Sequence, residues 1–143
     1  MNESPLLFGL LKGGDVVRRV VIDMHNHLFA DALAEALYKF DPDFDPVISA
    51  GPEKTVDLCN TVFANILIME VSNNASMRLE NRLDIRDVLK RNHFPCKIVL
   101  VVDENREEKL ADQVRQAKKD GLIDNFIYGS ISSSYLSAVI DAL

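Results

Sequence analysis

Residues 65–69 read Asn-Ile-Leu-Ile-Met, a run in which every position after the Asn is apolar. A strand that is apolar on both faces is typical of the centre of a parallel sheet, because helices cover both sides of such a sheet. Four further short runs have the Val, Ile and aromatic content that favours strands. They span residues 19–22, 47–50, 97–102 and 126–128.

Each of these strands is followed by a segment whose apolar residues recur at helical spacing. The first helix is predicted from Leu28, Phe29, Ala32, Leu33, Ala36 and Leu37, and the fourth, which is highly charged, over residues 106–119. Strands that alternate with helices of this length imply crossover connections and a parallel sheet. The sequence therefore predicts an α/β, flavodoxin-like, doubly wound three-layer sandwich, with a five-stranded parallel sheet in the order 2-1-3-4-5.

The length of the chain, 143 residues, corresponds to one domain. Residues 1–17 are predicted to form a leader and residues 18–143 the domain, with Lys12-Gly13-Gly14 as a flexible joint. The leader contains Leu6, Leu7, Phe8, Leu10 and Leu11. Burying apolar side chains of this kind stabilises a protein, because it removes them from water. We therefore expect the leader to pack on its own domain or on a partner chain.

The composition excludes several classes of protein. Apolar residues make up 48% of the chain and charged residues 27%, which excludes a disordered chain. The net charge of −6 argues against direct nucleic-acid binding by this domain. No apolar run approaches a membrane span, so a cytoplasmic location is expected. Cys59 and Cys96 form no C-x-x-C motif and are expected to be buried small side chains rather than a redox pair.

Chemistry in this architecture is expected at the carboxyl ends of the strands. The segments to consider are residues 23–27, 70–74, 102–105 and 129–132.

Two of these regions carry a resemblance to a known family. Residues 19–33 (RVVIDMHNHLFADAL) resemble the first strand and helix of response-regulator receiver domains, and residues 65–72 (NILIMEVS) resemble the receiver strand that bears the phospho-accepting Asp. The resemblance implies a receiver fold over residues 18–143. In that family, acids on the first strand hold Mg²⁺, and an Asp on the third strand is the nucleophile. A Thr or Ser on the fourth strand and a Lys on the fifth bind the phosphoryl group.

This chain departs from the receiver pattern at each of those positions. Aligned on the resemblance, the acid pair is replaced by Met24 and His25, and the phosphoacceptor position holds Glu70. The hydroxyl position falls at or near Val102, and the lysine position is Gly129. We therefore expect no phosphorylation, no catalysis, no metal and no cofactor.

The function that follows is a non-phosphorylatable receiver-like signalling module in a two-component or transcription-regulatory context. Its partner would be another protein or a second copy of the chain. The resemblance implies that contact uses the face formed by the fourth helix, the fifth strand and the fifth helix.

Glu70 has two interpretations. Its carboxylate sits one methylene further out than that of Asp, so it could imitate a phosphorylated Asp. Alternatively, it is an ordinary solvated acid at the end of a strand.

The run Asp23-Met-His25-Asn-His27 supports an alternative function. This D-x-H-x-H run is similar to the metal motif of amidohydrolases. Residues two apart on a strand point the same way, so both imidazoles could bind one metal. The alternative is a small metal-dependent hydrolase centred on His25 and His27, or a modest metal site using His25, Glu70 and Asp103. That family's barrel needs about 250 residues, far more than this chain has.

Overall fold

The computed structural model describes residues 17–129 and 133–143 of the chain. Five parallel strands form one sheet in the order β2-β1-β3-β4-β5, which confirms the predicted architecture. The strands are β1 (Arg18–Asp23), β2 (Phe44–Ile48), β3 (Ile66–Val71), β4 (Lys97–Val102) and β5 (Asn125–Tyr128). The helices are α2 (His27–Phe40), α3 (Thr55–Val62), α4 (Leu79–Arg91), α5 (Glu108–Lys119) and α6 (Ser133–Asp141), with short 3-10 turns η1 (Pro52–Lys54) and η2 (Ala75–Met77).

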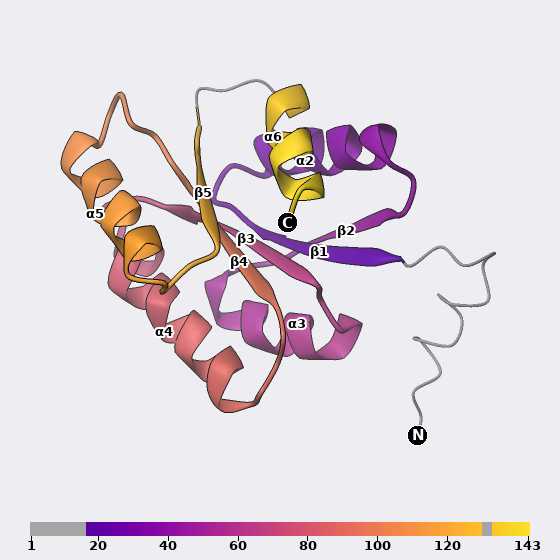
Figure 1. Cartoon of the computed structure of the whole chain (residues 1–143), viewed down its shortest axis with the longest axis horizontal. Coiled ribbons are helices and arrows are strands. Elements are labelled where there is room, and N and C mark those ends of the chain that lie inside the picture. Colours follow the sequence, from indigo (N-terminus) through magenta and orange to yellow (C-terminus); the bar gives the residue numbers. More distant parts are fainter. Residues whose placement is uncertain (1–16, 130–132) are drawn as a thin grey trace.

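The sheet is the middle layer of three. Helices α2 and α6 lie together on one face, and α3, α4 and α5 cover the other (Figure 1). Parallel strands are joined by such helical crossovers, and placing helices on both faces buries both sides of the sheet.

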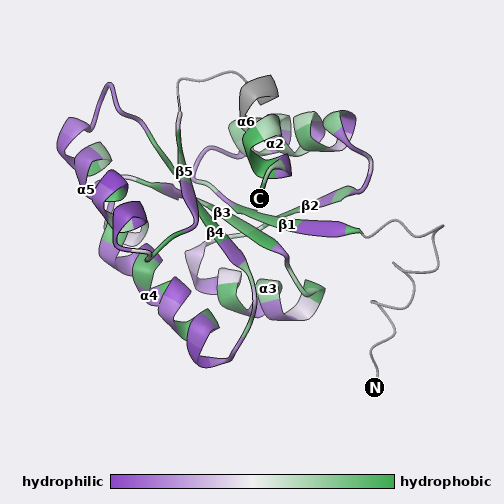
Figure 2. Cartoon of the chain, in the orientation of Figure 1, coloured by the Kyte–Doolittle hydropathy of each residue, from purple (hydrophilic) through white to green (hydrophobic). Residues whose placement is uncertain are grey.

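Side chains that alternate along the central strands make two separate cores. In β3, Leu67 and Met69 face α3, α4 and α5, whereas Ile66 and Ile68 face α2 and α6. All four are buried, and each contributes roughly 1.5–3 kcal/mol by leaving water. Apolar colouring accordingly runs along the inner strands, while polar colouring dominates the outward parts of α4 and α5 (Figure 2).

The helices begin and end where local chemistry requires. Asn26 caps α2, because its side-chain Oδ1 accepts a hydrogen bond from the backbone N–H of Phe29 at 3.1 Å. Helix α5 ends at Asp120, and Gly121 follows it with φ +76°, a conformation that glycine adopts without strain.

Several predicted boundaries differ from the structure by one to three residues, including the starts of β2 and α5. Strand β2 begins at Phe44 rather than at residue 47, and it contains Pro46. Because β2 lies at the edge of the sheet, a proline there costs no central ladder hydrogen bond. Helix α5 begins at Glu108 rather than at residue 106. The carboxylate of Asp103 accepts hydrogen bonds from the backbone N–H groups of Asn105 and Arg106. These residues therefore form a turn, and the helix begins after it.

The two cysteines are buried free thiols in the same core cluster, as the sequence predicted. A hydrogen bond to Cys59 and burial raise the pKa of the Cys96 thiol far above its ordinary value. A thiol held in its neutral form is a poor nucleophile.

The predicted leader and its glycine joint lie outside the described residues, except for Val17. Within the described part of the chain, no helix is both long and apolar enough to cross a bilayer.

Candidate functional site

The carboxyl ends of β1, β3, β4 and β5 surround a cavity of about 320 Å³. Apolar side chains and polar side chains both line it, and the loops that follow the strands contribute most of the polar ones. The lining residues are Met24, Asn26, Phe29, Glu70, Val71, Val101, Asp103, Asn105, Arg106, Glu107 and Gly129.

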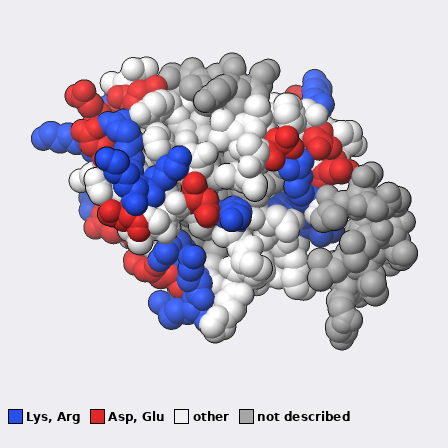
Figure 3. Space-filling view, in the orientation of Figure 1, with Lys and Arg blue, Asp and Glu red and all other residues white. Residues whose placement is uncertain are grey.

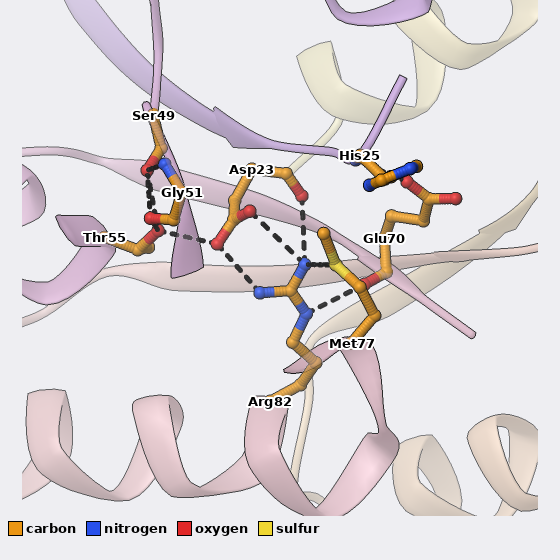
Figure 4. Close-up of polar contacts among 8 residues, drawn as sticks. All are labelled: Asp23, His25, Ser49, Gly51, Thr55, Glu70, Met77 and Arg82. Carbon is orange, nitrogen blue, oxygen red and sulfur yellow. Dashed lines mark hydrogen bonds and ion pairs between the residues drawn. The ribbon is translucent and has the colours of Figure 1, made fainter. Parts of the chain in front are cut away.

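A buried ion pair lies beside this cavity, between Asp23 at the end of β1 and Arg82 in α4 (Figure 4). Asp23 is 1% exposed and Arg82 is fully buried. The Nη1 atom of Arg82 donates to Oδ2 of Asp23 at 2.8 Å, and Nη2 donates to Oδ1 at 3.3 Å and to the backbone oxygen at 3.2 Å. The Nε atom donates to the backbone oxygen of Glu70 at 2.8 Å. One guanidinium therefore joins α4 to the ends of both β1 and β3.

Hydroxyl groups from the α3 side complete the surroundings of the Asp23 carboxylate. Thr55 Oγ1 donates to Oδ2 of Asp23 at 2.6 Å. The Oγ of buried Ser49 lies 2.9 Å from Thr55 Oγ1 and donates to the backbone oxygen of Gly51 at 2.8 Å. Buried polar groups are stable only when their hydrogen bonds are made, and this network makes them.

Glu70 is half-buried near the end of β3, and it is not a free surface acid. Its Oε1 accepts a hydrogen bond from the backbone N–H of His25 at 2.7 Å. The carboxylate thus holds the loop after β1, and Figure 4 shows the His25 ring beside it.

Two other cavity acids hold loops in the same way. Oε2 of Glu107 accepts from the backbone N–H of Asn73 at 2.8 Å, across two loops. Oδ1 of Asp103 accepts from the backbone N–H groups of Asn105 and Arg106 at 3.1 and 3.2 Å. Hydrogen bonds that involve a charged acceptor are stronger than neutral ones. The loops after β1, β3 and β4 are therefore fixed by carboxylates from the cavity wall.

The structure brings together four of the residues singled out from the sequence. Met24, Glu70, Asp103 and Gly129 all line the cavity. His25 is exposed and approaches Glu70 through its backbone. Val102 is fully buried and pairs with Val71 in the ladder, whereas Val101 is the register partner of Glu70 and lines the cavity.

The site does not fit the Mg²⁺ that the receiver resemblance implies. Hard divalent cations need several free oxygen ligands. Met24 supplies none, and the carboxylate that does end β1, Asp23, is already engaged by Arg82 and Thr55. No group of three or more His, Cys, Asp or Glu side chains placed to hold a metal occurs among the residues that the structure describes. His25 and His27 are both exposed, while Asp23 is buried, so the D-x-H-x-H run does not gather around one point.

Arg82 and Thr55 were missed by the sequence reasoning, which assigned no role to either. One signal was present for Arg82, because it lies three residues after Leu79 and seven before Leu89, on the helix stripe that faces the core. A cation on an apolar stripe indicates a buried acidic partner. The sequence does not say which acid that is.

No family model matches the chain, and no curated protein resembles it in sequence. Solved structures do resemble it. A response regulator from Thermotoga maritima superposes with a TM-score of 0.68 at 12% identity, covering 89% of this chain and 97% of its own. A DNA-binding response regulator of the LuxR family from Staphylococcus aureus gives 0.65 at 16% identity, covering 87% of this chain and 97% of its own. A response regulator protein from Burkholderia multivorans gives a TM-score of 0.62 at 15% identity, covering 89% of this chain and 94% of its own.

These likenesses establish the fold of the chain as that of receiver domains. At such low identity, fold similarity alone does not assign a function.

Proposed function

We propose that the chain is a receiver-like signalling module that is not phosphorylated, and that it acts through protein–protein contact in a two-component or transcription-regulatory context. The observation that carries the proposal is the buried Asp23–Arg82 pair, which uses the carboxylate at the end of β1 for structure. The proposal includes a cytoplasmic location and no cofactor.

The remaining cavity chemistry opposes phosphoryl transfer. Three carboxylates, those of Glu70, Asp103 and Glu107, line the cavity against one guanidinium, that of Arg106. This excess of negative charge repels an incoming phosphoryl group, which needs cations to neutralise its developing charge. Val101 and Gly129 carry no side-chain donor for the phosphoryl oxygens, and the backbone N–H of Gly129 already donates to the backbone oxygen of Val102 at 2.8 Å.

The test is incubation with acetyl phosphate and Mg²⁺, followed by intact-mass measurement, with a phosphorylatable receiver domain as positive control. We expect no added phosphoryl group on the wild type. We also expect none on Glu70→Asp, because restoring the family's nucleophile leaves the Asp23 carboxylate occupied. A phosphoryl adduct on the wild type that maps to the cavity would disprove the proposal.

The proposed contact face is formed by α5, β5 and α6, the fourth helix, fifth strand and fifth helix of the domain. On edge strand β5, the rings of Phe126 and Tyr128 lie edge to face with centroids 5.6 Å apart. Arg115 Nη1 donates to the Tyr128 hydroxyl at 2.6 Å, and Lys118 lies over the Phe126 ring at 5.8 Å. Half-buried aromatic rings beside Arg are typical of residues that carry binding energy at interfaces.

Charge on the neighbouring surface fits a protein partner better than a nucleic acid. Acidic and basic side chains are intermixed over α4 and α5 (Figure 3). Nucleic-acid binding needs an excess of Lys and Arg on one face.

The contact face can be tested by sedimentation of the purified chain. If the partner is a second copy, Tyr128→Ala should weaken dimerisation by about tenfold or more, as expected for an interface aromatic. Tyr38→Ala is the matched control, because Tyr38 is an exposed tyrosine on α2, which is not one of the three elements of this face. Equal effects of the two substitutions would contradict the assignment.

Nothing in the described residues favours the alternative hydrolase built on His25 and His27. Elemental analysis of untagged protein should find no zinc near one equivalent.

A further inference from the structure

The guanidinium of Arg82 is surrounded by oxygen atoms at the point where β1 and β3 end. Both carboxylate oxygens of Asp23, its backbone oxygen and the backbone oxygen of Glu70 accept from it at 2.8–3.3 Å. Met77 Sδ contacts Nη2 from η2. Thr55 Oγ1 lies on the same carboxylate, at 2.6 Å from Oδ2.

This arrangement has the chemistry of a hard-cation site. Carboxylate, hydroxyl and backbone carbonyl oxygens are the ligands that Mg²⁺, Mn²⁺ and Ca²⁺ take in proteins. Here a covalently attached cation makes those contacts instead. A guanidinium is a permanent cation in proteins, and this one is covalently attached to the chain, so it cannot dissociate from the site.

We propose that Arg82 is a built-in counter-ion that takes the place of a divalent cation at the carboxyl edge of the sheet. Its side chain masks a latent cation site formed by Asp23, Thr55 and the backbone oxygen of Glu70. The wild-type domain is consequently indifferent to divalent cations, and α4 stays tied to β1 and β3. This inference deepens the proposed function, on which it rests for its biological meaning, by explaining how the site is kept closed.

The experiment is a Mn²⁺ titration of the full chain, with amide resonances and thermal unfolding as readouts. Bound Mn²⁺ broadens the resonances of nearby residues, so it reports position as well as binding. On the wild type we expect no selective broadening at Asp23, Thr55 and Glu70, and no saturable rise in Tm. On Arg82→Ala we expect selective broadening at those residues. We also expect a Tm rise of about 5 °C or more when Mn²⁺ is in roughly hundredfold excess over its Kd.

Three further variants separate a cation site from general disruption. Asp23→Asn/Arg82→Ala removes the carboxylate and should lose the Mn²⁺ response. Arg82→Lys keeps a charge in place and should remain insensitive to Mn²⁺. Arg86→Ala, one turn further along α4, removes an arginine that pairs with Asp87 away from the strand ends, and it should behave as the wild type.

Selective broadening at Asp23 in the wild type would overturn the proposal, because the carboxylate would then be open to cations. So would an Arg82→Ala variant that folds but responds to Mn²⁺ no more than its Asp23→Asn double variant. If Arg82→Ala is unfolded without cations, Mn²⁺ should fold it. Failure to fold with Mn²⁺, while the double variant folds, would make Arg82 a structural tie only. None of these results alters the acetyl phosphate outcome, so the two proposals fail independently.

Discussion

Breaking the buried Asp23–Arg82 pair should cost far more stability than replacing both of its members. The pair has no contact with solvent, since Asp23 is 1% and Arg82 0% exposed. Substituting Arg82→Met leaves an uncompensated buried carboxylate, and Asp23→Asn leaves an uncompensated buried guanidinium. The double substitution, Asp23→Asn with Arg82→Met, leaves two neutral side chains, each close in volume to the one that it replaces.

The expected magnitude follows from this burial. Removing one partner of a buried pair costs about 3–5 kcal/mol, whereas replacing both is often close to neutral. We therefore expect each single substitution to lower the free energy of unfolding by about 3–5 kcal/mol. The double variant should lose much less than the sum, which gives a coupling energy of about 3 kcal/mol or more. The total free energy of unfolding of a domain is only about 5–15 kcal/mol. Each single variant should therefore melt roughly 10 °C or more below the wild type.

The assay is urea unfolding of the four proteins at 25 °C, followed by far-ultraviolet circular dichroism. Arg86→Met is the matched control, because Arg86 is on the same helix and only partly exposed beside Asp87. Single-variant losses below about 1 kcal/mol, or losses that simply add in the double variant, would refute the reasoning, because they are typical of exposed ion pairs.

Three further outcomes are expected. Beryllofluoride with Mg²⁺ should leave the amide resonances unchanged, and shifts that spread from Glu70 into β5 would show that a phosphorylation switch survives. The pKa of the Cys96 thiol is raised in the folded state. The contribution of this thiol to the free energy of unfolding is therefore fully present below about 8.5, the pKa of a thiol in the unfolded chain. Above it, stability should fall with pH by up to about 1.4 kcal/mol per unit, a slope that Cys96→Ala should reduce in pH-dependent urea unfolding. Deleting residues 1–14 should lower the Tm or change the oligomeric state, and no effect on either would show that the apolar leader packs on nothing.

Much of the fold could be predicted from the sequence because its signals are local. Strand β3 is apolar on both faces, and this pattern alone places it at the centre of a parallel sheet. The alternation of strands and helices then predicts the crossovers, and the strand order 2-1-3-4-5 follows from the flavodoxin-like architecture. The boundary predicted for β2 was less accurate, because the strand begins at Phe44 and contains Pro46, which the edge of a sheet accepts.

The candidate site was predicted only in part. Met24, Glu70 and Gly129 were located from the ends of their strands, and all three line one cavity. The role of Glu70 as the acceptor for the His25 backbone N–H was not predictable, because it depends on how the loop after β1 folds back over β3.

By itself, the sequence determined which residues form strands and which helix stripe is apolar. It also led to the prediction, which the acetyl phosphate experiment tests, that the chain lacks the groups for phosphoryl transfer. Only the tertiary structure decided that Asp23 meets Arg82, a residue 59 positions away. Local patterns report which side chains are buried, because burial follows the period of a helix or strand. Which buried charges meet depends on how separate elements cross, and a contact between distant residues leaves no local pattern. The Asp23–Arg82 ion pair is such a contact.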